Sequence, residues 1–73
     1  MTATIYRVYI SYQVKNKNRN IKSIIKDRLE TFVTTYNIEK IKDNIEIKTR
    51  ICYLHKQNID DVNIIITDIQ IQE

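Results

Sequence analysis

Residues 21–36 read IKSIIKDRLETFVTTY, and this stretch decides the fold that the sequence predicts. Its apolar side chains recur at intervals typical of one stripe along an α-helix: Ile21, Ile24, Ile25, Leu29, Phe32, Val33 and Tyr36. We therefore expect an amphipathic helix over 21–36, packed on the rest of the chain. Asn20 would cap its start, with Asn18 as the alternative, and Asn37 would end it in a left-handed conformation.

Alternating apolar and polar residues predict strands on both sides of this helix. In 5–14 the even-numbered residues form an apolar face, which we expect to meet the helix. Residues 45–55 alternate in the same way, and residues 62–72 form a third strand rich in isoleucine. The alternation of this last strand changes face near Thr67–Asp68. Either a β-bulge restores the register there or both faces are buried.

The resulting element order is β-α-β-β, which predicts an α+β fold with a single domain over 1–73. A right-handed crossover makes the first two strands parallel. The third strand would lie between them, giving a three-stranded antiparallel sheet in the order 1-3-2. One helix covers one face of such a sheet, so the other face and both edges stay available for a partner. We therefore expect a homodimer, formed by edge pairing or by sheet stacking.

The composition of the 73 residues excludes several kinds of chemistry. Glycine, proline and tryptophan are absent, so a glycine-rich phosphate loop is excluded and asparagine and aspartate must make the turns. Cys52 and His55 supply too few ligands for a zinc tetrad, and no acid–base or nucleophile set accompanies them. We expect no enzymatic activity, no metal and no cofactor. The lone cysteine, with no signal peptide and no membrane-length apolar run, predicts a cytoplasmic protein.

A cluster of basic residues precedes and enters the predicted helix, within a chain of formal net charge +3. The cluster comprises Lys15, Lys17, Arg19, Lys22 and Lys26. Because the N-terminus of a helix favours anions, these residues are candidates for binding an anion or a partner. The alternative is a solvated loop that keeps the protein in solution.

The outward face of the predicted sheet is the second candidate surface. It would carry Arg7, Tyr9, Gln13, Lys48, Arg50 and Lys56. Cations around an exposed aromatic ring are typical of RNA-binding sheets. The alternative is a dimer face, or a surface on which long cations cover apolar neighbours. The remaining tyrosines, Tyr6, Tyr12, Tyr36 and Tyr53, are expected in the core or at its rim. Asp68 is expected to face solvent.

The predicted element order resembles that of dodecins and of half of a ferredoxin-like domain. The resemblance to dodecins would imply a tryptophan that stacks on flavin, and this chain has none. We expect instead a small protein-binding module, a phage or mobile-element factor that inhibits host or defence machinery by occupying a binding surface. The bias toward Ile, Asn, Lys and Tyr, typical of AT-rich coding sequences, suggests that setting. The alternative function is nucleic-acid binding through the basic loop 15–22 and the outward sheet face.

Overall fold

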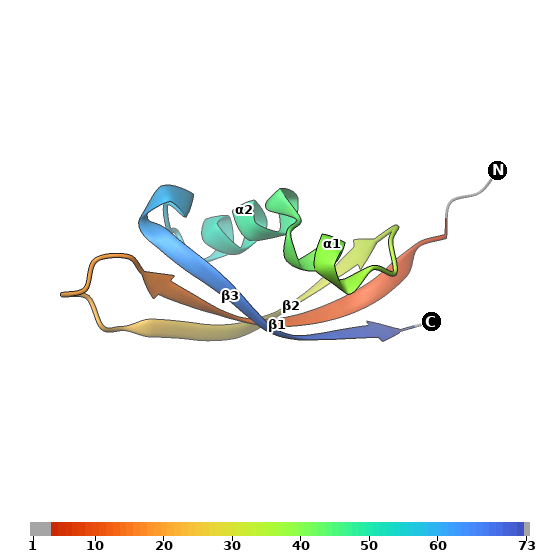
Figure 1. Ribbon diagram of the computed structural model, residues 1–73, viewed down its shortest axis with the longest axis horizontal. Helices are drawn as coiled ribbons and strands as arrows, with labels where there is room; N and C mark the ends of the chain where they lie inside the picture. The colour runs from red at the N-terminus through yellow and green to blue at the C-terminus, as the bar shows by residue number, and fades with distance from the viewer. Residues whose placement is uncertain (1–3, 73) are drawn as a thin grey trace.

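The computed structural model describes residues 4–72 and shows a three-stranded antiparallel sheet with helices on one face (Figure 1). In chain order the elements are β1 (Tyr6–Asn16), β2 (Ile24–Val33), α1 (Ile38–Lys42), α2 (Ile45–Leu54), the 3-10 turn η1 (Ile59–Asp61) and β3 (Val62–Gln72). The strand order is β2-β1-β3, so β1 is central and both neighbours run antiparallel to it. The predicted α+β class and antiparallel sheet are confirmed.

The predicted helix over 21–36 is wrong, because most of this stretch is the edge strand β2. It pairs with β1 along all 10 of its residues. Ile25, Leu29 and Val33 lie at intervals of four, which places them on one face of a helix and equally on one face of a strand. Leu29 and Val33 are buried beneath the helices, whereas Phe32, which the helix would have buried, is 60% exposed.

The predicted strand over 45–55 is also wrong, because Ile45–Leu54 forms the helix α2. Ile47 and Ile51, one helical turn apart, are buried against the sheet. Tyr53, which a strand would have placed on the same face as both, is 83% exposed. This segment appeared to alternate because two buried residues of one helical face, Ile47 and Ile51, are flanked in the sequence by two exposed apolar residues, Ile45 and Tyr53.

The order 1-3-2 is wrong for the same reason, since the second strand comes from 24–33 and not from 45–55. The predicted antiparallel neighbours, 5–14 and 62–72, do pair as β1 and β3. The observed element order is β-β-α-α-β, and the resemblance to dodecins and to half of a ferredoxin-like domain therefore no longer holds.

Asparagine side chains begin each helical segment of the described residues. Asn37, Asn44 and Asn58 accept hydrogen bonds from the first backbone N–H groups of α1, α2 and η1. All three have negative φ, so the left-handed conformation predicted for Asn37 is wrong. Among the described residues, positive φ occurs at Lys56, at 54°. Asn20 caps no helix and instead lies in the β1–β2 loop.

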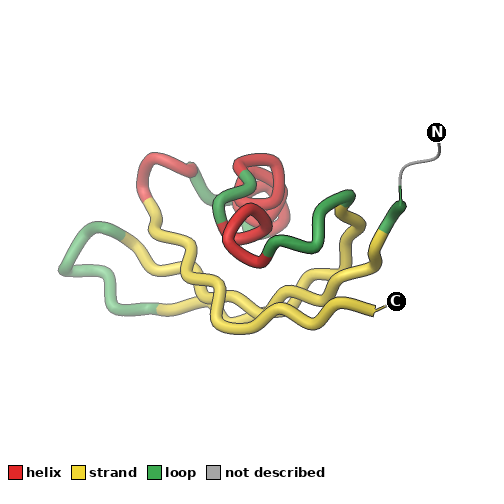
Figure 2. Tube along the Cα trace, turned by 45° about the vertical axis from the view of Figure 1, so that its right-hand side comes forward, coloured by secondary structure: helices red, strands yellow, loops and turns green. Residues whose placement is uncertain are grey.

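The core lies between the helices and one face of the sheet (Figure 2). Its buried side chains are Val8, Ile10, Tyr12, Val14, Leu29, Val33, Ile41, Ile47, Ile51, Cys52 and Val62. The even-numbered residues of β1 supply four of these, as the alternation predicted. Tyr12 is in the core and Tyr6 packs against it. Tyr36 is 52% exposed and its ring lies edge-on to Tyr6, with 5.0 Å between the ring centres, so it lies at the rim, as predicted. Tyr53 is 83% exposed, and the position predicted for it is wrong.

A β-bulge keeps four isoleucines of β3 on the core side: Ile64, Ile66, Ile69 and Ile71. Ser11 pairs with Asp68 and Tyr12 with Ile66, which leaves Thr67 as the extra residue. The Thr67 hydroxyl donates a hydrogen bond to the Ser11 carbonyl oxygen at 3.2 Å. Of the two alternatives for Thr67–Asp68, the structure shows the β-bulge, and Asp68 is exposed, as predicted.

Two truncations distinguish the helix α2 from a strand over the same residues. Ile51→Ala should lower the free energy of unfolding by about 2–5 kcal/mol, because it leaves a cavity in the core. Tyr53→Ala should cost about 1 kcal/mol or less, because its side chain is largely exposed. Urea denaturation of both variants measures the difference. Equal, large losses would mean that both side chains face the core, as in a strand, and would contradict this fold.

Candidate functional site: a basic outer sheet face

One face of the sheet carries no helix among residues 4–72, because α1 and α2 both lie on the other (Figures 1 and 2). We call the bare surface the outer face. Its residues on β1 are Arg7, Tyr9, Ser11, Gln13 and Lys15. On β2 the paired positions are Phe32, Glu30, Arg28, Lys26 and Ile24, and on β3 they are Gln72, Gln70, Asp68, Ile65 and Asn63. Side chains on neighbouring strands at these positions share one face.

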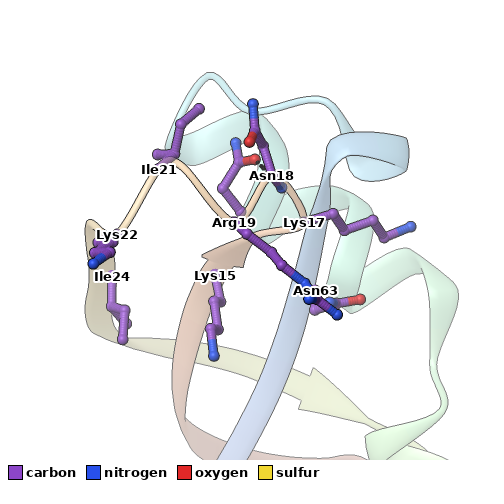
Figure 3. A pocket seen from close by; sticks show the side chains of 9 residues that line it. Lys15, Lys17, Asn18, Arg19, Ile21, Lys22, Ile24 and Asn63 are labelled. Carbon is purple, nitrogen blue, oxygen red and sulfur yellow. Dashed lines mark hydrogen bonds between the residues drawn. The ribbon is translucent and has the colours of Figure 1, made fainter.

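At one end of the outer face, the β1–β2 loop borders a hollow of about 500 Å³ (Figure 3). Its lining includes four cations that we call the basic end: Lys15, Lys17, Arg19 and Lys22. The amide side chains Asn16, Asn18 and Asn63 and the apolar Ile21 and Ile24 complete it. No Asp or Glu among the described residues lines this hollow. The structure thus brings together four of the five predicted basic residues around one concave surface.

The loop that carries the basic end is held by hydrogen bonds. The Asn18 N–H donates to Asn16 Oδ1 at 2.8 Å, and the Asn20 N–H donates to Asn18 Oδ1 at 3.0 Å. The Lys17 N–H donates to the Asp61 carbonyl oxygen at 2.9 Å and so ties the loop to η1. These bonds give the loop a defined backbone, although it contains no glycine. The cations are therefore presented from an ordered turn and not from a helix N-terminus, so the predicted dipole contribution is absent.

Charge is distributed unevenly along the chain. Residues 1–26 include six lysine and arginine residues and no Asp or Glu, so all 9 acidic residues follow residue 26. Asp60 and Asp61 line a second hollow of about 300 Å³. It adjoins the first, since both are lined by Asn16, Lys17, Asn18 and Ile21. The two aspartates therefore lie beside the basic end, next to Lys17, but do not line its hollow.

Lys26, the fifth predicted basic residue, lies outside the hollow on the outer face of β2. It pairs with Gln13, which is the next residue after Lys15 on the outer face of β1, going away from the loop. The next cation is Arg28, whose guanidinium carbon lies 4.6 Å from the centre of the Tyr9 ring. Arg28 also donates a hydrogen bond to Gln70 Oε1 at 3.0 Å, across all three strands. These contacts fix the guanidinium over the middle of the outer face.

Arg7 occupies the far end of the outer face. Its Nε lies 3.3 Å from Glu30 Oε1, and its guanidinium carbon lies 5.8 Å from the centre of the Phe32 ring. An exposed ion pair of this kind contributes little to stability. Phe32 remains 60% exposed beside it, so a large aromatic ring is available at this end.

Three of the residues predicted for the outward face lie elsewhere. Lys48 and Arg50 belong to α2, and Lys56 follows its end. Arg50 Nη1 donates to Thr31 Oγ1 at 3.2 Å, from the helical side of the sheet. Arg7, Tyr9 and Gln13 do lie on the outer face, as predicted. Sequence reasoning missed Arg28 and Phe32 there, because both were assigned to a helix. The β-branched or aromatic run over 31–35 was the signal that favoured a strand here.

On the helical side, the end of α2 is joined to the sheet by a polar contact. A hydrogen bond of 2.6 Å links Tyr12 Oη and His55 Nε2, and Asp27 Oδ2 lies 3.5 Å from the same nitrogen. Burial, and to a lesser degree the charge of Asp27, raise the pKa of Tyr12. Burial likewise raises the pKa of Cys52, which keeps this thiol neutral within the core.

Among residues 4–72, no three side chains of His, Cys, Asp or Glu gather as metal ligands. None of the described helices is long and apolar enough to cross a membrane. No protein-family model, curated protein or solved structure matches this chain. Its function is therefore argued from its own surfaces.

The raised pKa of Tyr12 predicts a loss of stability at alkaline pH. The folded protein holds this phenol proton more tightly than the unfolded chain, whose tyrosine titrates near 10.0. The stabilising contribution is complete below that pH and is lost as the pH rises through the folded pKa. Between about pH 9 and pH 11, the free energy of unfolding should therefore fall more steeply in the wild type than in Tyr12→Phe.

Urea denaturation across that pH range measures both slopes. Tyr53→Phe makes the same change at an exposed tyrosine and should keep the wild-type slope. Identical slopes in the wild type and Tyr12→Phe would show that Tyr12 titrates equally in both states.

Proposed function

We propose that this chain is a non-enzymatic module that binds nucleic acid through its basic end and outer face. The observation that carries the proposal is the hollow at the β1–β2 loop. Four cations and three asparagine amides surround it, and no acidic side chain of the described residues lines it. Lysine and arginine supply the charge that attracts phosphates, and amides can donate hydrogen bonds to phosphate oxygens.

The shape of the sheet supports an extended ligand. The β1–β2 loop projects beyond the helices at the left end of Figure 1, opposite the C-terminal end of β3. From there the cations continue through Lys26 and Arg28 to Arg7. Lys15 and Arg7 lie about 27 Å apart along β1, at roughly 3.4 Å per residue. A strand of nucleic acid along this face would meet phosphate contacts at the loop and an exposed ring, Phe32, for base stacking at the far end.

Removal of three loop cations tests the proposal. Lys17→Ala/Arg19→Ala/Lys22→Ala should weaken binding to oligonucleotides of any sequence, because phosphate contacts carry no sequence information. The slope of log affinity against log salt should become shallower by about 2–3, at roughly 0.7–0.9 for each lost phosphate contact. Fluorescence anisotropy with labelled single-stranded and double-stranded oligonucleotides at several salt concentrations measures both quantities.

The matched control is Lys40→Ala/Lys42→Ala/Lys48→Ala, which removes the same charge from α1 and α2. It should leave most of the affinity and the salt slope in place, because these residues lie on the helical side. Equal losses in both triple variants would mean that only net charge matters. No binding by the wild type at low salt would reject the proposal.

A second candidate function is protein binding, and the apolar side chains at the two sides of the outer face favour it. Ile24 and Phe32 on β2 are 45% and 60% exposed, and Ile65 on β3 is 45% exposed. Exposed apolar groups around polar ones are typical of a surface that a partner protein covers. The setting we propose for this function is a phage or mobile-element factor in the host cytoplasm that inhibits host or defence machinery by occupying a binding surface.

Protein binding predicts a different response to substitution. Phe32→Ser/Ile65→Ser should abolish retention of a partner from host lysate, with little effect on oligonucleotide affinity. Tyr53→Ser/Leu54→Ser, which changes two exposed apolar residues of α2, should leave retention intact. Retention that is unchanged by the outer-face variant would exclude this surface as the binding site.

A further inference from the structure

The edge of β2 is open to another strand. In the part of the chain that the structure describes, β2 pairs on one side with β1 and no strand pairs with its other side. An open edge presents unpaired N–H and C=O groups that can accept a further strand. The register of β2 is continuous over its 10 residues, whereas the opposite edge strand, β3, contains the bulge beside Ser11. A regular strand is the better template, because a bulge interrupts pairing.

The sequence of β2 is complementary to itself in one antiparallel register. Paired residues of adjacent strands must share a face, so a two-fold axis can pass only through a residue position and not between two. With the axis at Leu29, Arg28 lies opposite Glu30 of the second copy, and this opposite-charge pair occurs twice. On the other face, Ile25 lies opposite Val33 of the second copy, also twice, which extends the apolar row of the core side.

Three neighbouring registers each place like charges directly opposite each other. With the axis at Arg28, two arginines oppose each other, although Lys26 then lies opposite Glu30 twice. With the axis at Glu30, two glutamates oppose each other. With the axis at Asp27, two aspartates meet and Lys26 opposes Arg28. Like charges in directly opposed positions destabilise a sheet, whereas opposite charges contribute roughly 0.2–1 kcal/mol for each pair.

We propose that this protein forms a two-fold symmetric dimer in which the β2 edges of two copies pair antiparallel about Leu29. The two three-stranded sheets then join into one continuous sheet, with both helical layers on one side and both outer faces on the other. Because the pairing is antiparallel, the two basic ends lie at opposite ends of β2, far from each other. The dimer is independent of what the outer face binds.

Cysteine cross-linking tests the register directly, in a Cys52→Ala background. Opposed residues of an antiparallel pair have Cα atoms about 4.5–5.5 Å apart, which is within the range of a disulfide. Arg28→Cys and Glu30→Cys are prepared separately and then mixed under mild oxidation. The expected result is a covalent dimer that forms faster in the mixture than in either protein alone. Faster cross-linking of Arg28→Cys with itself, or equal rates in all three samples, would overturn the register.

Charge reversal provides a second test that keeps the native cysteine. Light scattering should give the wild type twice the chain mass of 8.8 kDa. Glu30→Arg and Arg28→Glu each place like charges opposite each other twice and should give monomers. The double variant Arg28→Glu/Glu30→Arg restores the opposite charges and should restore the dimer. Glu39→Arg, an equal charge change on exposed α1, should remain dimeric.

A wild type that stays monomeric across the accessible concentration range would overturn the proposal. So would a double variant that fails to recover the dimer while both single variants are monomeric and folded by circular dichroism.

Discussion

Burial of one face of β1 is the constraint on which the rest of this structure depends. β1 is the strand to which both neighbours pair, and its even-numbered residues Val8, Ile10, Tyr12 and Val14 are almost completely buried. A chain of this length buries only about 60% of its unfolded surface, so one such row is a large part of what holds it together. The two short helices must cover that row, and they have no further length with which to cover the opposite face.

The one-sided core determines where charge can lie. Because the outer face contributes nothing to the core, it tolerates arginine and lysine on β1 and β2, and glutamine on β1 and β3, without a desolvation penalty. On the helical side, a polar side chain next to the core needs a polar partner. Asp27 on β2 is an example, because it lies beside His55 at the end of α2. At the β1–β2 loop, no Asp or Glu of the described residues lines the hollow at the basic end, and Asp60 and Asp61 line the hollow that adjoins it.

The sequence correctly predicted two of the three strands, β1 and β3. β1 alternates over its whole length, and in β3 the change of face at Thr67–Asp68 left two alternatives, of which the β-bulge is observed. The basic end was also predictable, because a charged segment without apolar residues must lie in a loop, whichever elements it joins. The predicted place of the basic end at a helix N-terminus was wrong, because the element that follows the loop is the strand β2 and not a helix.

The helix predicted over 21–36 is mostly the strand β2, and the strand predicted over 45–55 is the helix α2. These two errors show why the spacing of apolar residues alone could not assign the secondary structure. An interval of four residues is shared by both structures, so Leu29 and Val33 fit a helix and a strand equally. The run from Thr31 to Thr35 is β-branched or aromatic throughout and favours a strand. In the other segment, the repeated triplet Asn-Ile-Glu at 37–39 and 44–46 marks the starts of α1 and α2, with asparagine as the cap of each. Capping chemistry was thus a better guide than periodicity here.

The residues that made β2 hard to recognise are the ones that its edge position permits. Inside a sheet, a strand buried on one face shows a clean alternation, because a polar residue on the core side would be costly. At an edge, Asp27 and Thr31 can occupy core-side positions, because each reaches a polar group of α2 or its cap, His55 and Arg50 respectively. The same position leaves the side chains of Arg28 and Glu30 exposed, while the Arg28 N–H donates to Asp27 Oδ1 at 2.8 Å within the strand. A strand with polar residues on both faces gives a weak sequence signal, because its alternation is interrupted. The charged residues that interrupt it, Arg28 and Glu30, are those on which the proposed pairing of two β2 edges depends.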